Sequence, residues 1–148
     1  MNSVITSRIL FLFFIFLCSS ASANSDIIGS IKVIQGDVII AKGDSQQKAK
    51  LHDKIYEGDI VETKDTGNIA LLFVDGTQFS IGPNSHMIIN RYLFSPKQKR
   101  YAFDVMLNSG SAIYTSGRLS KLAPEAVKIQ TPQAVIGVRG TKFLVEVD

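Results

Sequence analysis

The segment Gln130-Thr131-Pro132-Gln133-Ala134-Val135-Ile136-Gly137-Val138-Arg139-Gly140-Thr141-Lys142-Phe143-Leu144-Val145 decides the expected fold, because its second half repeats the form of an earlier segment. Gly76-Thr77-Gln78-Phe79-Ser80-Ile81 has the same pattern, Gly-Thr-x-Phe followed by a residue and then Ile or Val. In both places an apolar run reaches a two-residue break, Asp75-Gly76 or Arg139-Gly140, and a second alternating run follows. Asp-Gly between such runs is a strong signal for a type I′ turn. The two segments therefore predict β-hairpins.

The turn predicts the pairing of each hairpin. A two-residue loop at Asp75-Gly76 would pair Val74 with Thr77, Leu72 with Phe79 and Ala70 with Ile81. Phe79 would then point into the core, while Leu71 and Phe73 would lie on the opposite face beside polar Gln78 and Ser80. We interpret Leu71 and Phe73 as a possible interaction surface. Applied to the second segment, the same rule pairs Ile136 with Phe143 and Ala134 with Val145, so that Phe143 also points into the core.

The first 23 residues have the pattern of a cleavable signal peptide. Arg8 follows a polar start, an apolar run extends over residues 9–17, and Ala21-Ser22-Ala23 precedes Asn24. The apolar run is shorter than the roughly 20 residues that a membrane span needs. An uncleaved anchor is the alternative, and a lipid on Cys18 is disfavoured because Leu17, rather than a small residue, precedes it. We expect cleavage after Ala23 and a periplasmic or secreted protein.

The expected mature chain, residues 24–148, is a cysteine-free single domain. Without Arg8, 15 Lys and Arg face 13 Asp and Glu, so that the net charge is +2. With no disulfide available, its stability has to come from an apolar core. Residues 24–88 carry a charge of −3 and residues 89–148 a charge of +5. The basic half could face an acidic partner, although so small an asymmetry is typical of a solvated surface.

Short β-type runs separated by Gly, Asp, Asn and Pro predict an all-β fold. The expected strands cover residues 27–34, 37–41, 59–63, 68–74, 77–81, 86–94, 101–108, 111–115, 126–130 and 141–147. Short antiparallel strands and hairpins should form an elongated domain that is solenoid-like or sandwich-like. Residues 42–50 are expected to be a polar loop. The basic segment 95–100 is interpreted as a charged hairpin tip that discourages aggregation, and not as a nucleic-acid site.

No catalytic, metal-binding or cofactor-binding residue is predicted. His52 and His86, the two histidines, are 34 residues apart and lack the spacing of a metal site. No Gly-x-Ser-x-Gly segment suggests a serine nucleophile. Gly137-Val138-Arg139-Gly140-Thr141 lacks the lysine of a phosphate-binding loop. We therefore do not expect an enzyme.

Several segments together resemble the FecR domain family. The residues that carry the resemblance lie in two motifs. The first contains Asp75, Gly76, Thr77 and Phe79, and the second contains Thr131, Pro132, Gly137, Gly140, Thr141 and Phe143. Further likeness is found at Gly36-Asp37-Val38 and over residues 51–63. The resemblance covers about residues 30–147 and implies a periplasmic, all-β, non-catalytic domain. In the best-known members, such a domain senses an outer-membrane transporter and controls a sigma factor. A signal peptide in place of a cytoplasmic domain and membrane helix makes direct sigma-factor control unexpected here.

Two functions remain open at this stage. The first is a periplasmic protein-interaction or sensory module that binds a protein of the cell envelope through strand edges or through the Leu71 and Phe73 face. The second is a structural or glycan-binding protein of the cell envelope, which would use the basic half together with Tyr92, Tyr101 and Tyr114. The first function needs an exposed apolar patch, whereas the second needs a basic groove lined by tyrosines.

Overall fold

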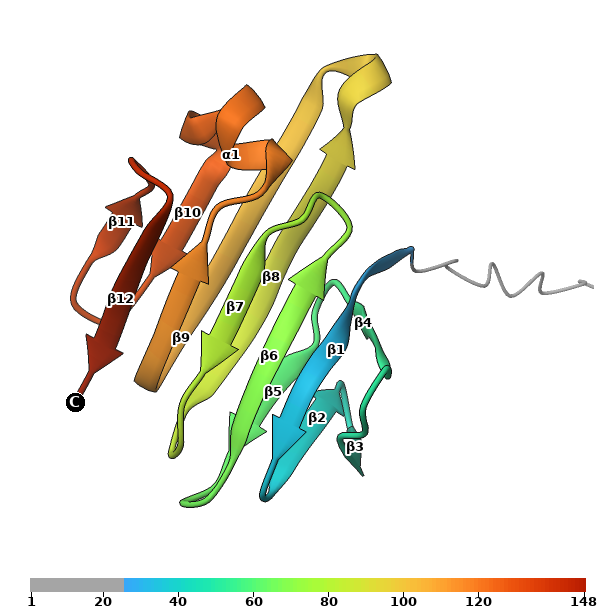
Figure 1. Cartoon of the computed structure of the whole chain (residues 1–148), viewed down its shortest axis with the longest axis vertical. Helices are drawn as coiled ribbons and strands as arrows, with labels where there is room; N and C mark the ends of the chain where they lie inside the picture. The colour runs from blue at the N-terminus through green and yellow to red at the C-terminus, as the bar shows by residue number, and fades with distance from the viewer. Residues whose placement is uncertain (1–25) are drawn as a thin grey trace, which may run out of the picture.

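The computed structural model describes residues 26–148, and the predicted signal peptide with Cys18 lies outside this range (Figure 1). Two packed sheets share one long strand, β9 (Arg100–Thr115). Sheet A has the order β4 (Lys54–Tyr56), β1 (Ile27–Gln35), β6 (Asn68–Phe73), β7 (Gln78–Ile81), the second half of β9, and β12 (Lys142–Val147). Sheet B has the order β3 (Ser45–Lys48), β2 (Val38–Lys42), β5 (Ile60–Thr63), β8 (His86–Ser95), the first half of β9, β10 (Val127–Gln130) and β11 (Val135–Gly137). Neighbouring strands are antiparallel, except that β10 runs parallel to β9.

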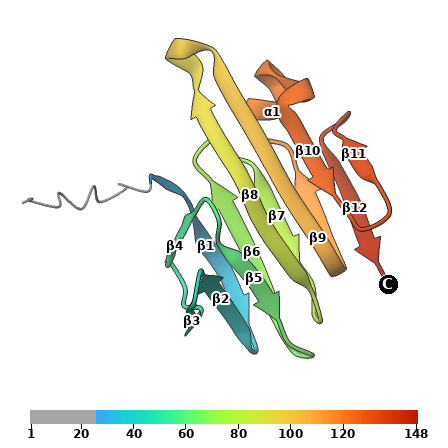
Figure 2. The same cartoon turned by 180° about the vertical axis from the view of Figure 1, so that it is seen from behind.

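Sheet A lies in front in Figure 1, and Figure 2 shows the molecule from the side of sheet B.

The all-β prediction is confirmed. The predicted strands are present with ends within one residue, except that 101–108 and 111–115 are parts of β9. The sequence did not predict β3, which lies inside the expected polar loop, or the short strand β4. It placed the residues of β11 in the second hairpin, beside residues 143–145, and not beside β10. It also did not predict the helix α1 (Arg118–Leu122) or the 3-10 turn η2 (Pro124–Ala126), whereas the turn η1 (Pro96–Gln98) forms the tip of the expected β8–β9 hairpin.

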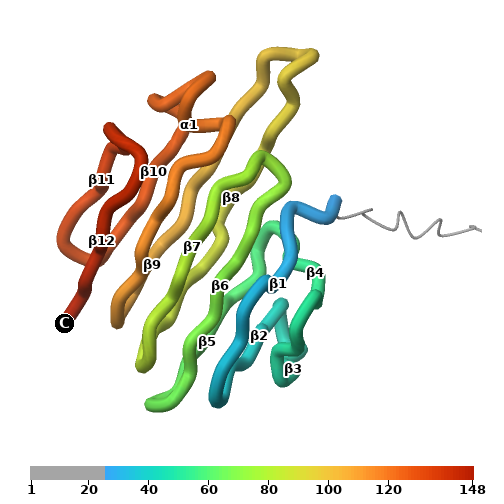
Figure 3. The backbone as a smooth tube through the Cα atoms, viewed as in Figure 1, coloured from blue at the N-terminus to red at the C-terminus, as the bar shows by residue number. Residues whose placement is uncertain are grey.

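Four tight corners connect the two sheets at one end of the molecule. They join β1 to β2, β5 to β6, β7 to β8, and the two halves of β9, as the tube in Figure 3 shows. Adjacent corners are hydrogen bonded: Lys64 N–H donates to the Asp37 carbonyl at 3.0 Å, and Asn84 N–H donates to the Lys64 carbonyl at 3.1 Å. Gly82 N–H continues the series by donating to the Ser111 carbonyl at 2.9 Å. The corners therefore stack like the coils of a short solenoid.

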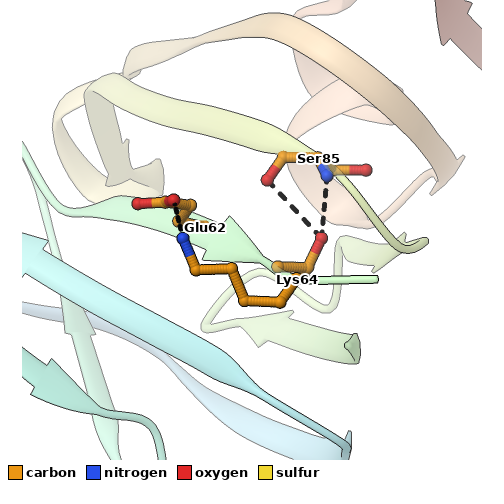
Figure 4. A network of polar contacts seen from close by, with 4 residues as sticks. Glu62, Lys64 and Ser85 are labelled. Carbon is orange, nitrogen blue, oxygen red and sulfur yellow. Dashed lines mark hydrogen bonds and ion pairs between the residues drawn. The ribbon is translucent and has the colours of Figure 1, made fainter. Parts of the chain in front are cut away.

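Side chains reinforce this stack of corners. The Thr63 hydroxyl donates to the Gly82 carbonyl at 2.7 Å and accepts a hydrogen bond from Ser85 N–H at 2.9 Å. The Ser85 hydroxyl in turn accepts a hydrogen bond from Ser111 N–H at 3.0 Å. Figure 4 shows Ser85 within this network, with the surface ion pair of Lys64 and Glu62 beside it. Thr63 and Ser85 are buried, so these bonds satisfy polar groups that water cannot reach.

Glycine is required where two corners touch. Gly110 has a φ of +86°, and a Cβ atom there would lie 2.1 Å from the Ser85 hydroxyl oxygen. Gly36 has a φ of +65°, and its Cβ would lie 2.1 Å from the Thr66 carbonyl oxygen. A side chain at either position would be both strained and too close to its neighbour. Gly110 thus allows β9 to turn from sheet B into sheet A.

Aromatic side chains fill the core between the sheets. Phe73 contacts three rings, with centroids 4.9 Å from Phe103, 5.3 Å from Tyr92 and 6.2 Å from Phe79. The Phe79 ring in turn lies 5.3 Å from the ring of Tyr114. Each of these five side chains is at most 7% exposed. Edge-to-face and stacked pairs at these distances add to the stabilisation from burial.

The predicted register of the first hairpin is wrong by one residue. Leu71 pairs with Phe79 and Leu72 with Gln78, because the loop is the three-residue segment Val74-Asp75-Gly76. Gly76 N–H donates to the Phe73 carbonyl, and Gly76 adopts a φ of +88°, as in a type I turn followed by a bulge. The one-residue shift turns Leu71 and Phe73 into the core. Phe79 remains buried, as predicted.

The predicted second hairpin is also wrong. β11 pairs with β10, and β12 pairs with β9, so that Phe143 lies opposite Tyr114 and not opposite Ile136. Likewise Val145 lies opposite Ala112 and not opposite Ala134. Arg139-Gly140 therefore belongs to a connection between the two sheets. Gly140 adopts a φ of +111° in that connection. A type I′ turn would also have required a positive φ at Arg139, which is costly for a residue with a side chain.

The new position of Phe143 changes the expected effect of its removal. Its ring is half-buried and lies tilted against the ring of Tyr114, with a centroid distance of 5.1 Å. Phe143→Ala is expected to lower the free energy of unfolding by about 1–2 kcal/mol, less than for a fully buried phenylalanine. Denaturant unfolding measures this change. A loss above about 3 kcal/mol would contradict half-burial at this position and agree with the hairpin that the sequence predicted.

Candidate interaction surface

The first family motif forms a buried polar cluster around Asp75. One carboxyl oxygen accepts hydrogen bonds from the Tyr92 hydroxyl at 2.8 Å and from Thr77 N–H at 3.3 Å. The other accepts from the Thr77 hydroxyl at 2.6 Å and from Leu119 N–H at 3.0 Å. The Asp75 carbonyl accepts from Arg118 N–H at 2.8 Å. Asp75 thereby ties the β6–β7 loop to β8 and to the first turn of α1.

This cluster stabilises the fold, and its geometry offers no reactive group at the surface. Asp75 is 1% exposed and Thr77 is fully buried. Burial, together with the nearby Asp75 carboxyl group, raises the pKa of Tyr92 far above its usual range. Burial also raises the pKa of Tyr114. Both phenols therefore remain protonated over the accessible pH range, and the Tyr92 hydroxyl donates to Asp75.

The second family motif also has local structural roles. The Thr131 hydroxyl accepts a hydrogen bond from Ala134 N–H at 3.0 Å, which closes the turn that contains Pro132 between β10 and β11. The Thr141 carbonyl accepts from Ser116 N–H at 2.8 Å and aligns β12 with β9. Gly137 ends β11. Thr131, Pro132, Gly137 and Thr141 therefore set the path of the chain from sheet B to sheet A.

The histidines lie apart from each other in the fold. His52 is exposed in a turn and has a φ of 70°. His86 is half-buried at the start of β8, where its Nδ1 atom lies 2.9 Å from the Asn108 side-chain nitrogen. Within residues 26–148, no cluster of three or more His, Cys, Asp or Glu side chains is arranged to hold a metal ion.

One buried carboxyl group has an unpaired oxygen. Asp59 is 2% exposed, and its Oδ2 atom accepts a hydrogen bond from Tyr56 N–H at 2.8 Å. Its Oδ1 atom has no hydrogen-bond partner among the described residues. Burial raises the pKa of Asp59, while the hydrogen bond from Tyr56 N–H and the nearby Lys42 charge oppose the shift. The Lys42 ammonium group lies 4.4 Å from the centre of the Tyr56 ring, and Lys42, Tyr56 and Asp59 line the same small hollow.

Two surfaces proposed from the sequence are not present. Leu71 is 1% exposed and Phe73 is 2% exposed, so the predicted Leu71 and Phe73 interaction surface is wrong. The physical reason is the one-residue register shift, which exchanged the faces of β6. A basic groove lined by tyrosines is absent too, because Tyr92 and Tyr114 are core residues and only Tyr101 of the three is half-buried.

An apolar row crosses the outer face of sheet A instead. Cross-strand pairs place Val33 of β1 beside Ala70 of β6, Ala70 beside Ser80 of β7, Ser80 beside Ile113 of β9, and Ile113 beside Leu144 of β12. We call these five residues the outer row. Val33 is 51% exposed and Leu144 is 60% exposed. The outer row lines a shallow hollow of about 320 Å³. Exposed apolar groups gathered in this way are typical of an interaction surface.

The outer row ends at an open strand edge. Within the part of the chain that the structure describes, β12 pairs with β9 alone. The bond from Ser116 N–H to the Thr141 carbonyl shows which residues of β12 face β9. Because hydrogen bonding alternates along an antiparallel strand, the N–H and C=O groups of Lys142, Leu144 and Glu146 point away from β9. These backbone groups are free to pair with an added strand.

Comparison with known proteins identifies the family. The model of the family described as FecR protein matches residues 59–148, and the chain belongs to this family. FecR family proteins are associated with the cell envelope. No curated protein matches the chain. A solved structure titled "Cell surface anchoring domain" is 34% identical over 41% of this chain and 82% of its own, with a TM-score of 0.40. No helix within residues 26–148 is long and apolar enough to cross a membrane.

Proposed function

We propose that this protein is a non-catalytic protein-interaction module that works outside the cytoplasm, with the outer face of sheet A as its docking surface. The observation that carries the proposal is the outer row, in which side chains from β1, β6, β7, β9 and β12 form one apolar strip. Membership of the FecR family supports a partner in the cell envelope. The sensory role of the best-known family members is one form that such binding could take.

The placement of polar groups supports binding rather than catalysis. The Asp75 carboxyl group accepts four hydrogen bonds from groups inside the fold, so its oxygens are not available to a substrate. The outer row itself contains one hydroxyl group, that of Ser80, and no charged side chain. Apolar contact with hydrogen bonding at the edge of the strip is the ordinary basis of protein recognition.

Substitutions in the outer row test this proposal. Val33→Asp combined with Ile113→Thr is expected to weaken partner capture at least about tenfold, since two anchor contacts are lost. The measurement is recovery of crosslinked partner from intact cells. Val74→Asp is the matched control, because Val74 is 58% exposed but lies at the β6–β7 turn, outside the row.

A second control concerns the histidines. His52→Ala combined with His86→Ala should leave both partner capture and the cellular phenotype unchanged. If this variant folds normally but loses function, a titratable site exists and the non-catalytic proposal is wrong. If the outer-row variant captures as much partner as the unmodified protein, the docking surface lies elsewhere.

A further inference from the structure

We infer that the open edge of β12 pairs with the same edge of a second copy of this chain, in an antiparallel and two-fold symmetric arrangement. This inference goes beyond the proposed function, because it concerns the edge of sheet A and not its outer face. Its starting point is the sequence Lys142-Phe143-Leu144-Val145-Glu146, in which opposite charges flank a central leucine. The burial pattern of β12 alternates, so Lys142, Leu144 and Glu146 share the exposed face.

The charge pattern of β12 is complementary to itself. When two copies of β12 run antiparallel and are centred on Leu144, each Lys142 lies opposite Glu146 of the second copy. Leu144 then lies opposite Leu144. Opposite charges and apolar pairs in directly facing positions both stabilise an antiparallel pair. Each favourable contact between opposite charges occurs twice because the interface is two-fold symmetric.

The backbone permits this register and excludes its nearest alternatives. Lys142, Leu144 and Glu146 carry the outward N–H and C=O groups, so pairs between these residues would be hydrogen-bonded pairs. A shift by one residue would set the outward N–H and C=O groups of one copy opposite residues of the other copy whose backbone groups point toward β9. A shift by two residues would set Leu144 against a charge, and a parallel arrangement in register would set lysine against lysine. The centred antiparallel register is therefore the one that satisfies backbone and side chains together.

Pairing at this edge would also extend the outer row. Leu144 is its last member, and 60% of that side chain is exposed in the single chain. Across the two-fold axis, Ile113 and Leu144 of one copy would continue into the same residues of the other. β12, now the edge strand of sheet A, would become an interior strand of a sheet that extends through both copies. β11 lies beside this edge in sheet B (Figures 1 and 2) and is three residues long, so it is the element that has to accommodate the second copy.

Charge reversal tests the pairing without altering the core. The chain is expressed from residue 1, purified in the processed form it takes, and examined by sedimentation over a range of concentrations. Lys142→Glu alone and Glu146→Lys alone should each weaken self-association at least about tenfold, because like charges then face each other twice. An equimolar mixture of the two single variants should form a heterodimer, because every pair of positions 142 and 146 across the axis then carries opposite charges. The double variant should again self-associate.

Disulfide trapping tests the register. In a Cys18→Ser background, Leu144→Cys should crosslink to itself, because directly opposed residues of a hydrogen-bonded pair have Cα atoms about 5.5 Å apart, within disulfide range. Lys142→Cys should not crosslink to itself, but it should crosslink to Glu146→Cys in a mixture. A chain that stays monomeric at every concentration, or that crosslinks equally at all positions, overturns the inference. Lys142→Glu and Glu146→Lys leave all five residues of the outer row unchanged. Loss of pairing with intact partner capture in these two variants would therefore leave the proposed function standing.

Discussion

Asp75→Ala is expected to lower the free energy of unfolding by at least about 3 kcal/mol, because three buried groups lose their acceptor at once. These groups are the Tyr92 hydroxyl, the Thr77 hydroxyl and Leu119 N–H, which lie 2.6–3.0 Å from the carboxyl oxygens. Each buried donor left without a partner costs about 1–3 kcal/mol. The loss should also release α1 from the β6–β7 loop. Denaturant unfolding of the purified protein measures the change.

Asp65→Ala is the matched control for this experiment. Asp65 is an exposed aspartate in the turn between β5 and β6, so its removal should change stability by less than about 0.5 kcal/mol. A similar small effect for Asp75→Ala would mean that the carboxyl group is solvated and that the buried cluster does not exist. Asp75→Asn keeps the shape of the side chain but offers an NH₂ group in place of one acceptor, so it should fall between aspartate and alanine.

Phe73→Ala is expected to cost about 3–5 kcal/mol through lost burial and the cavity left behind. The Phe73 ring is 2% exposed and contacts the rings of Phe79, Tyr92 and Phe103. Val74→Ala, at the next position, removes a side chain that is 58% exposed and should have little effect. The comparison distinguishes the two registers of the hairpin. If Val74→Ala were the more damaging substitution, the register that the sequence predicted would be correct.

The sequence was sufficient to predict the longer strands but not the pairing at the first turn. Asp-Gly suits a two-residue type I′ loop, but it also suits a three-residue loop in which glycine forms the bulge. The signal that favours the second loop was present in the strands. Pairing Phe79 with Leu71 gathers Ile69, Leu71, Phe73, Phe79 and Ile81 on one face, whereas the predicted register divided them. Burial of large side chains on one face therefore outweighed the turn statistics.

The second error has a different cause. Residues 140–145 repeat the pattern of residues 76–81, and both segments do form strands beside the second half of β9. They differ in a second respect: β7 also pairs with the preceding strand β6, whereas β12 does not pair with the preceding strand β11, which pairs with β10 in the other sheet. The chain between β9 and β12 passes through α1, β10 and β11. Pairing between segments so distant in sequence leaves no local signal. The repeated motif therefore predicted correctly that residues 141–147 form a strand, but it predicted the wrong strand as the neighbour of that strand.

The interaction surface could not be read from the sequence for the same reason. The outer row combines single residues from five strands, and each residue alone is an ordinary member of an alternating pattern. Val33 and Leu144 are more than 100 positions apart in the chain. Only the order of strands in sheet A brings them into one strip. At Leu71 and Phe73, a one-residue shift in the β6–β7 register moves both side chains from the predicted surface into the core.

Photocrosslinking from Ile113 in intact cells tests the central claim most directly. A photoreactive amino acid at position 113 lies in the outer row between Ser80 and Leu144. One at Asn90, an exposed residue of β8 in sheet B, serves as the control. We predict a covalent adduct with an envelope protein from position 113 and none from position 90. Adducts from position 90 alone, or from neither position, would contradict the claim that the outer face of sheet A is the docking surface.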